Sequence, residues 1–208
     1  IWALYEKTGI DKSEILDFTE LAAIATVGDV MDLQGENRII VKHGLRRLSE
    51  TTRPGLQALI RVNNLEGAEI TAYHVGFVLG PCINASGRLD TATRALALLC
   101  TEDRQKAAKL AGDLYDLNQS RKAMTEQGKE QAINEIETES INKDRVLVVY
   151  LPECHESLAG IIAGRIRELY HKPVFVLTKA ENGVKGSGRS IEAYSMYEEL
   201  VKCRDLLI

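Results

Sequence analysis

The sequence predicts an α/β fold with a mostly helical first part, one long connecting helix, and a smaller α/β part that contains a mixed sheet. Up to about residue 100, apolar residues recur at the spacing of helices. Residues 101–140 are highly charged and contain no proline, which is typical of one long helix. After Lys143, short runs of β-branched and apolar residues are typical of buried strands.

Residues that favour helix starts divide the first part into short helices. The ranges 21–28 and 37–50 both have helical spacing of apolar residues. Aspartate and threonine favour the N-cap and proline favours the first turn, so each such residue ahead of an apolar run is a candidate start. The candidates are Asp17 or Thr19, Pro54, Thr71 and Asp90.

The long stretch from Thr101 to Ser140 predicts a single helix that connects two domains. At about 1.5 Å per residue, its roughly 38 residues would extend about 57 Å. Its apolar stripe is narrow, and a helix of this kind more often bridges two domains than fills one core. Gly128 is a candidate bend in it.

The last part predicts a β-α-β unit followed by a hairpin. Ranges 145–151 and 173–178 have the composition of buried strands, and range 155–170 between them has the apolar face of a helix. A right-handed crossover is expected. The Asn-Gly turn at 182–183 predicts a third strand, 184–190, antiparallel to the second.

A final helix is expected from about Tyr194. Its apolar residues are expected to face inward; they are Tyr197, Leu200 and Val201.

Bulk properties indicate a globular protein with no general affinity for polyanions. Of its 208 residues, 45% are hydrophobic and 27% charged, and the net charge is −4. No apolar run approaches the roughly 18 residues of a membrane span, so no membrane partner is expected. Range 37–61 contains six basic residues and one acidic residue, and a solvated helix face is the preferred interpretation of that excess. The four single cysteines exclude zinc-finger spacing and suggest reduced thiols in a cytoplasmic protein.

Two segments rich in glycine, Gly80–Asp90 and Lys185–Ser190, suggest phosphate binding. Each is expected to form a loop that combines glycines with a hydroxyl and a guanidinium. Glycines let a ligand reach backbone N–H groups, and the arginine fork fits a phosphate. A ligand that carries phosphate is therefore the leading hypothesis.

Three residues in the first part are candidates for binding. Asp29 follows an uncharged segment and would be paired or bound to a cation if buried, although a surface aspartate that caps a turn is the preferred interpretation. Two structural alternatives exist: the Asn84 side chain can stabilise a turn by a hydrogen bond to its own backbone, and Arg88 can form an ion pair with Asp90. For Asn84 and Arg88 we favour phosphate binding.

His155 is a candidate because it directly precedes a helix. A single histidine is usually structural or exposed, but at a helix N-terminus it lies beside free N–H groups that attract anions. The His155-Glu156 pair is not a zinc-protease motif, because position 159 is alanine where a second histidine is required.

The third strand supplies the preferred binding candidates. Glycine weakens a strand and often marks the close approach of a ligand, while a β-bulge is the alternative explanation. The candidates are Gly186, Ser187, Gly188, Arg189 and Ser190.

Taken in order, four motifs resemble the RecJ single-strand-specific exonucleases, which belong to the DHH phosphoesterases. The resemblance covers nearly the whole chain. The motifs are Ala25–Met31, Gly80–Leu89, His155 with Gly160–Ala163, and Gly186–Ser190.

The resemblance implies a domain organisation. Residues 1–100 would be the C-terminal, mostly helical part of a DHH domain, 101–140 the connecting helix, and 141–208 a truncated DHHA1-like substrate-binding domain. DNA would lie in the cleft between the two domains.

The resemblance also implies an activity. The family hydrolyses single-stranded DNA from 5′ to 3′ with two Mn²⁺ or Mg²⁺ ions, in DNA repair and recombination. By the matching motif, Asp29 would be a metal ligand, and Asn84 and Arg88 would meet phosphate near the metals. The DNA backbone would be held by His155, Ser187 and Arg189.

The sequence departs from the family pattern at several points. The family's Asp-x-Asp, a further aspartate and the Asp-His-His triplet do not occur in it. The chain is expected to begin after these motifs and to stop before a Gly-Gly-His segment. Cys82 stands where many relatives carry arginine, so the phosphate contact that this arginine would make is not expected here. We therefore expect the parent protein to be the nuclease, and this fragment to be inactive and to bind cations poorly.

Two other functions stay open at this point. One is a DHH-family phosphodiesterase that cleaves short oligonucleotides or cyclic dinucleotides. The other is a non-enzymatic scaffold that binds nucleic acid and has lost the metals. The partners expected are single-stranded DNA and, as further candidates, a single-strand-binding protein or a helicase.

Overall fold

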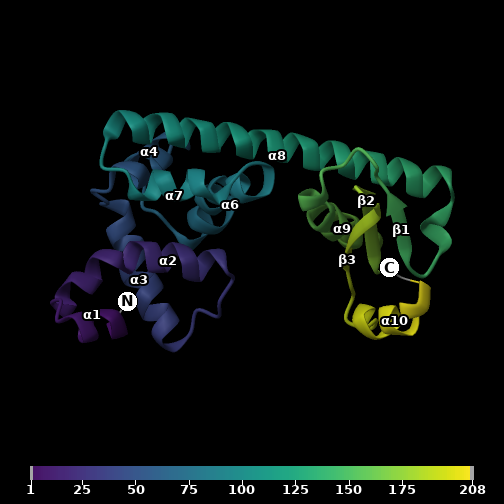
Figure 1. The fold of residues 1–208 in the computed structure, drawn as a ribbon, viewed down its shortest axis with the longest axis horizontal. Helices are drawn as coiled ribbons and strands as arrows, with labels where there is room; N and C mark the ends of the chain where they lie inside the picture. Colours follow the sequence, from purple (N-terminus) through teal and green to yellow (C-terminus); the bar gives the residue numbers. More distant parts are fainter. Residues whose placement is uncertain (1, 207–208) are drawn as a thin grey trace. The chain divides into compact units, whose positions relative to one another are not determined.

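The computed structural model of the protein describes residues 2–206, apart from the side chains of residues 2, 3, 12 and 13. The chain divides into two compact units, one ending at Asn118 and the other beginning at Gln119. The boundary lies within α8 (Arg104–Thr138), a single helix of 35 residues (Figure 1). The long helix predicted from charge and from the absence of proline is confirmed.

The first unit is entirely helical within the described residues. In chain order its elements are α1 (Trp2–Thr8), a 3-10 helix (Lys12–Phe18), α2 (Thr19–Gly28), α3 (Gly35–Ser49), α4 (Pro54–Val62), α5 (Ala72–His74), a π-helical segment (Val75–Leu79), α6 (Gly80–Leu89), α7 (Ala92–Cys100) and the first part of α8.

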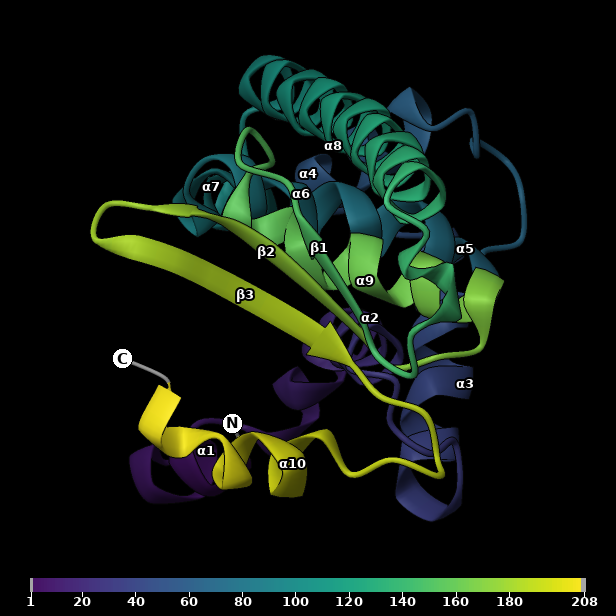
Figure 2. The ribbon, with the colours of Figure 1, turned by 90° about the vertical axis from the view of Figure 1, so that its right-hand side faces the viewer.

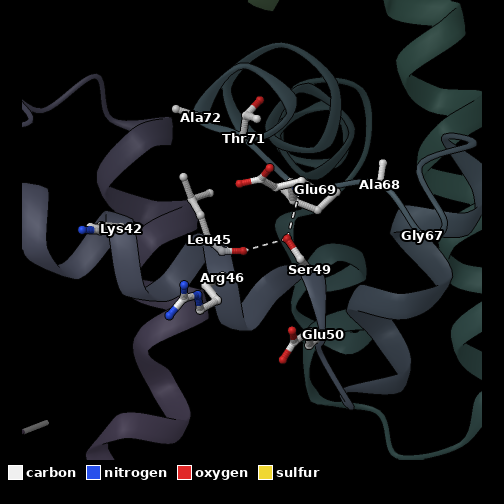
Figure 3. Close-up of a pocket in the computed structure, with 11 residues that line it drawn as sticks. Lys42, Leu45, Arg46, Ser49, Glu50, Gly67, Ala68, Glu69, Thr71 and Ala72 are labelled. Atoms are coloured by element: carbon white, nitrogen blue, oxygen red, sulfur yellow. Dashed lines mark hydrogen bonds between the residues drawn. The ribbon is translucent and has the colours of Figure 1, made fainter.

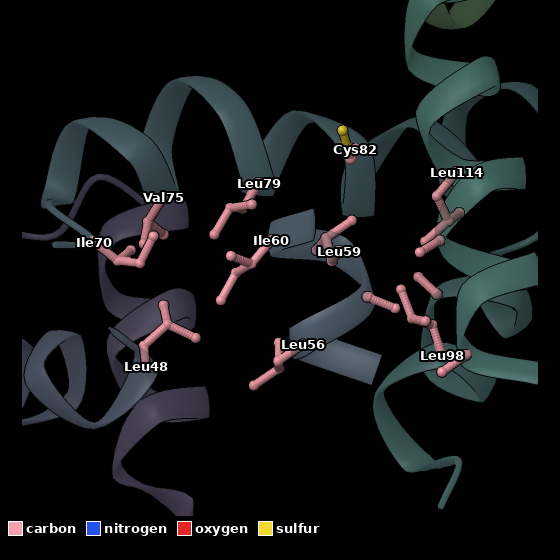
Figure 4. Packing of buried hydrophobic residues seen from close by; sticks show 14 residues of the cluster. Leu48, Leu56, Leu59, Ile60, Ile70, Val75, Leu79, Cys82, Leu98 and Leu114 are labelled. Atoms are coloured by element: carbon pink, nitrogen blue, oxygen red, sulfur yellow. The ribbon is translucent and has the colours of Figure 1, made fainter. Parts of the chain in front are cut away.

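The core of the first unit is built from the apolar faces of these helices (Figure 4). Leu48, Leu59 and Leu98 are fully buried in it, from α3, α4 and α7. The helices α2 and α3 pack closely, since a Cβ at Gly44 would lie 3.0 Å from the Thr19 carbonyl carbon. The burial predicted from helical spacing is thereby confirmed for α3 and α4.

Two of the predicted helix starts are confirmed and two are wrong. Pro54 begins α4, and Thr71 caps α5 by accepting from the His74 N–H in a capping box. The N-cap of α2 is Phe18, with no side-chain hydrogen bond. The N-cap of α7 is Thr91, because the Asp90 carboxylate is instead engaged by Arg94 at 2.5 Å.

The segment Gly80–Asp90 was expected to be a loop, and this expectation is wrong: Gly80–Leu89 is the helix α6. A helical run begins at the Thr71 cap and passes through the π-helical segment into α6. A Cβ at Gly80 would lie 2.7 Å from the Val75 carbonyl oxygen, so glycine there serves close packing. Pro81 is tolerated because it lies in the first turn. Burial of one face of α6 outweighs the roughly 1 kcal/mol that each glycine costs a helix.

The second unit packs helices against a three-stranded mixed sheet (Figure 2). Besides the second part of α8, its elements are a 3-10 turn (Ile141–Lys143), β1 (Leu147–Tyr150), α9 (Glu156–Tyr170), β2 (Val174–Ala180), β3 (Gly183–Arg189), α10 (Met196–Lys202) and a 3-10 turn (Arg204–Leu206). The strand order is β1-β2-β3, with β1 parallel and β3 antiparallel to β2. The predicted β-α-β unit and hairpin are confirmed.

The core of the second unit lies between α9, the sheet and the second part of α8. Ile162 of α9 and Val176 of β2 are fully buried in it. A Cβ at Gly128 would lie 2.5 Å from Ile162 Cδ1. Gly128, expected as a bend, therefore lies in a continuous helix and lets α9 approach α8.

The predicted inward face of α10 is wrong. Tyr197 is 79% exposed and Val201 52% exposed, and Leu200 is also exposed. Met196 instead lies against β3, beside the position where Gly188 has no side chain. Across residues 2–206, no helix combines the length and the apolarity needed to cross a bilayer.

Candidate nucleic-acid interface

In the first unit, Asn84 and Arg88 lie on one exposed face of α6. They are four residues apart in a helix, so their side chains are neighbours one turn apart. Asp90, the alternative partner considered for Arg88, contacts Arg94 at 2.5 Å. An amide and a guanidinium on the same face are suited to bind one phosphate.

Cys82 lies on the opposite, buried face of α6. Its Sγ is 3.4 Å from Asn118 Nδ2 and 3.8 Å from Asn63 Nδ2. Two residues of a helix correspond to a rotation of about 200°, which separates Cys82 from the face of Asn84. In this protein, position 82 contributes a packed thiol and no exposed charge.

Asp29 is the C-cap residue of α2 and is exposed. A carboxylate at this end of a helix faces the negative end of the helix dipole, which is unfavourable without a cation. The next residue, Val30, has φ of 55°, a strained value for a β-branched residue. Among the described residues no group of three or more His, Cys, Asp or Glu could hold a metal ion. These residues alone therefore do not fit a two-metal site, to which Asp29 would contribute one oxygen ligand.

In the second unit, His155 caps the N-terminus of α9. Its Nδ1 accepts from the Ser157 N–H at 3.3 Å and lies 2.8 Å from Ser157 Oγ. Because Nδ1 is the acceptor, the neutral ring carries its proton on Nε2. The exposed His155 side chain can therefore donate from Nε2 at the N-terminus of α9, the positive end of the helix dipole.

The side chains of β3 lie over the first turns of α9. A Cβ at Gly160 would be 2.8 Å from Ser187 Oγ and 2.9 Å from Arg189 Nη2. Glycine at 160 is thus what lets these two side chains approach the helix. Arg189 is exposed, and its Nη1 donates to the Gly188 carbonyl at 2.8 Å. That hydrogen bond uses one of the five guanidinium N–H groups.

A small pocket adjoins this contact. It has a volume of about 230 Å³ and is lined from α9, β2 and β3 by Glu156, Ser157, Ala159, Thr178, Lys185 and Gly186. Lys185 Nζ lies 3.0 Å from Glu156 Oε2 across it. Lys185 begins the segment predicted to bind phosphate, although it was not among the candidate site residues, and Glu156 directly follows the candidate His155.

The β-bulge proposed as an alternative explanation for the glycines of β3 is wrong. All seven residues of β3 pair in regular register with β2, from Val174↔Arg189 to Ala180↔Gly183. Gly186 and Gly188 instead make room for Leu177 and Met196.

Ser190 closes the turn after β3. Its Oγ donates to the Tyr194 carbonyl, and its own carbonyl accepts from Arg167 Nη1 at 3.5 Å. The structure therefore gives Ser190 a role in holding the end of β3.

Comparison with known proteins supports a single family. No family model matches the chain. The single-stranded-DNA-specific exonuclease RecJ of Escherichia coli is 36% identical over 201 residues, which cover 94% of this chain and 35% of that protein. RecJ of Thermus thermophilus is 35% identical over 208 residues, covering 100% of this chain and 29% of that protein. The resemblance to RecJ is confirmed.

Solved structures agree with the sequence relatives. RecJ from Thermus thermophilus in complex with Mg²⁺ matches with a TM-score of 0.86 and 35% identity, over 100% of this chain and 32% of that one. Exonuclease RecJ bound to manganese matches with a TM-score of 0.83 and 35% identity, over 100% and 50%. The chain is thus similar to a RecJ-type fragment, spanning about a third of the curated relatives it matches.

These similarities bear on the functions left open by the sequence. The RecJ relatives are enzymes named as single-strand-specific exonucleases. The comparisons do not favour a phosphodiesterase that cleaves oligonucleotides or cyclic dinucleotides. They do not favour a non-enzymatic scaffold either. Asn84 and Arg88 lie in the first unit and His155, Ser187 and Arg189 in the second. That both groups face one DNA-binding cleft stays a prediction.

Proposed function

We propose that this chain is part of a metal-dependent exonuclease that hydrolyses single-stranded DNA from 5′ to 3′. The observation that carries the proposal is the similarity to single-strand-specific exonucleases over the whole chain. Because the chain spans about a third of those relatives, we propose the activity for the complete protein. DNA repair and recombination in the cytoplasm would be its setting, with a single-strand-binding protein or a helicase as partner.

We assign the DNA backbone to the contact between α9 and β3. The Nε2–H of His155, at the positive end of the α9 dipole, would donate to a phosphate, and the Arg189 fork would neutralise its charge. Ser187 would add a hydroxyl beside Arg189. Asn84 and Arg88 on α6 would hold a further phosphate.

We assign Mn²⁺ or Mg²⁺ to the complete enzyme. Two such ions would activate a water molecule and stabilise the leaving oxygen. Asp29 would be one of their oxygen ligands, in line with the preference of hard cations for carboxylates. Because the described residues do not complete this set, the chain by itself should bind single strands and not hydrolyse them.

The test measures binding and hydrolysis separately. Binding of a labelled oligothymidylate to the 208-residue chain is followed by fluorescence anisotropy, and we expect Arg189→Ala to weaken it roughly tenfold, as for loss of a hydrogen bond to a charged group. The matched control is Arg165→Ala on α9, whose partner is Glu168 at 3.5 Å. Equal affinities of wild type and Arg189→Ala would contradict the assignment. Robust turnover of labelled single strands with Mn²⁺ would contradict the expected inactivity.

A further inference from the structure

The basic excess of range 37–61 separates into paired and unpaired residues. Three arginines have carboxylate partners; the pairs are Arg47–Asp17 at 2.8 Å, Arg53–Glu20 at 2.6 Å and Arg61–Glu66 at 2.8 Å. Arg38, Lys42 and Arg46 have no carboxylate within ion-pair distance anywhere in the described part of the chain, and all three are exposed. Of the six basic side chains in this range, these three are the ones left without a carboxylate partner among the described residues.

These three residues form one line along α3. They are spaced by four residues, which places them on the same helix face about 6 Å apart along the axis. We call them the α3 stripe. Three unpaired positive charges at regular intervals match a partner that carries negative charge at regular intervals, which is the character of a nucleic-acid backbone.

A groove of about 630 Å³ adjoins two residues of the stripe, Lys42 and Arg46 (Figure 3). Lys42 and Arg46 of α3 and its C-cap residue Glu50 lie on one side, and the segment 67–72 forms the other. Ser49 ties the two sides together: its Oγ accepts from the Ile70 N–H at 2.9 Å and donates to the Leu45 carbonyl at 3.0 Å. The hydrogen bond from the Ile70 N–H holds the segment 67–72 against the end of α3.

An exposed aromatic pair follows the segment 67–72 in the sequence. Tyr73 and Phe77 stack with ring centroids 5.1 Å apart and planes at 28°. They are 64% and 68% exposed, respectively. Exposed rings stack on bases of any sequence and are a recurrent means of binding single strands.

We propose that the α3 stripe and its groove bind the backbone of single-stranded nucleic acid, as a contact in addition to those at α6 and at α9 and β3. This inference rests on the proposed function, because it assigns the same substrate to a further surface. The carboxylates of Glu50 and Glu69 also line the groove. They repel phosphates and side-chain carboxylates alike, but they can accept hydrogen bonds from the N–H groups of bases, which the acidic side chains of a peptide do not offer.

The test compares two triple variants with the same change in net charge. In the first, Arg38, Lys42 and Arg46 are all replaced by serine. In the control, three exposed lysines of α8, Lys106, Lys109 and Lys122, are replaced by serine; none has a carboxylate within ion-pair distance among the described residues. Affinity for a labelled oligothymidylate is measured by anisotropy at several salt concentrations, and circular dichroism checks that each variant folds.

We expect the slope of log affinity against log salt to fall by about 2 in the stripe variant, since each phosphate contact on a single strand contributes about 0.7. The control variant should keep the wild-type slope. An unchanged slope in the stripe variant, or an equal fall in the control, would overturn the inference. Competition by polyglutamate as effective as that by unlabelled oligothymidylate would do so too, because it would indicate an acidic protein partner.

The two proposals fail in different ways. If Arg189→Ala weakens binding while the stripe variant does not, the α3 contact is refuted and the proposed function stands. If the wild-type chain shows no affinity for oligothymidylate at low salt, both are refuted together.

Discussion

At the scale of single residues, His155 connects the stability of α9 with binding. Its Nδ1 acts as the cap acceptor for the Ser157 N–H, and the same choice of tautomer leaves Nε2–H as a donor. Protonation of the ring would add the charge that attracts phosphate, but it would remove the cap acceptor. The neutral tautomer is therefore the one that serves both purposes.

Two substitutions separate these purposes. Asparagine is a good N-cap residue, so His155→Asn should keep the stability of the unit while losing the Nε2 donor. His155→Ala should lose both, with a fall in the free energy of unfolding of about 1 kcal/mol. Urea denaturation measures the free energy of unfolding, and fluorescence anisotropy measures the affinity for oligothymidylate. A His155→Asn variant that binds as tightly as wild type would show that the histidine only caps the helix.

The approach of Arg189 to α9 depends on Gly160, and Gly164 on the same helix offers a matched control substitution. A Cβ at Gly160 would lie 2.9 Å from Arg189 Nη2, whereas a Cβ at Gly164 would be 4.0 Å from Arg189 Cγ, an ordinary contact. We expect Gly160→Ala to weaken DNA binding by displacing the Arg189 guanidinium. Gly164→Ala should bind normally and gain up to about 1 kcal/mol of stability from helix propensity. Equal binding by both variants would contradict this account of Gly160.

At the scale of elements, Tyr170 joins the end of α9 to α8 through its hydrogen bond to Glu137 Oε1 at 2.6 Å. Burial raises the pKa of Tyr170 to about 12, with the hydrogen bond to Glu137 and the repulsion by its carboxylate acting in the same direction. The folded pKa lies above the ordinary value of 10, so the protonated phenol is the form that stabilises the fold. Its contribution is complete below pH 10 and is lost as the pH rises towards about 12.

A comparison with Tyr170→Phe measures this contribution. The variant lacks the titrating hydroxyl, so its melting temperature should fall less than that of wild type between pH 10 and about 12. At neutral pH, Tyr170→Phe should be less stable by about 1.5 kcal/mol, because it lacks one hydrogen bond to a charged group. Parallel melting curves of the two proteins across the alkaline range would refute the assignment.

The elements that could be predicted are those whose burial follows a regular period. The strands and the crossover helix were predicted correctly because β-branched runs and helical spacing record which face is buried. α6 was mistaken for a loop because its glycines suggested loop conformations, whereas Gly80 is required by the nearby Val75 carbonyl. The face of α10 was wrong because Met196, rather than Tyr197, meets the sheet through the gap at Gly188. Both errors come from particular packing contacts, which local composition does not record.

At the scale of the whole molecule, the same limit applies to the candidate site. Residue types indicated phosphate binding by His155, Ser187 and Arg189; in the structure Ser187 and Arg189 meet at Gly160 of α9, and His155 caps the start of the same helix. A metal site needs several ligands that the fold brings to one point, so the sequence position of Asp29 alone could not predict one. Whether the exposed Asp29 carboxylate binds a metal depends on the oxygen ligands in its surroundings.

Those surroundings predict how the chain responds to metal. A divalent cation needs about six oxygen ligands, and a single exposed carboxylate cannot compete with water for it. A ligand that binds only the folded state at one hundred times its dissociation constant would stabilise the chain by about 2.7 kcal/mol, so tight binding would be obvious. We therefore expect Mn²⁺ to leave the melting temperature unchanged in both wild type and Asp29→Asn, and chelators to leave oligothymidylate binding unchanged. A rise in melting temperature with Mn²⁺ that Asp29→Asn abolishes would show that the chain already holds a metal site.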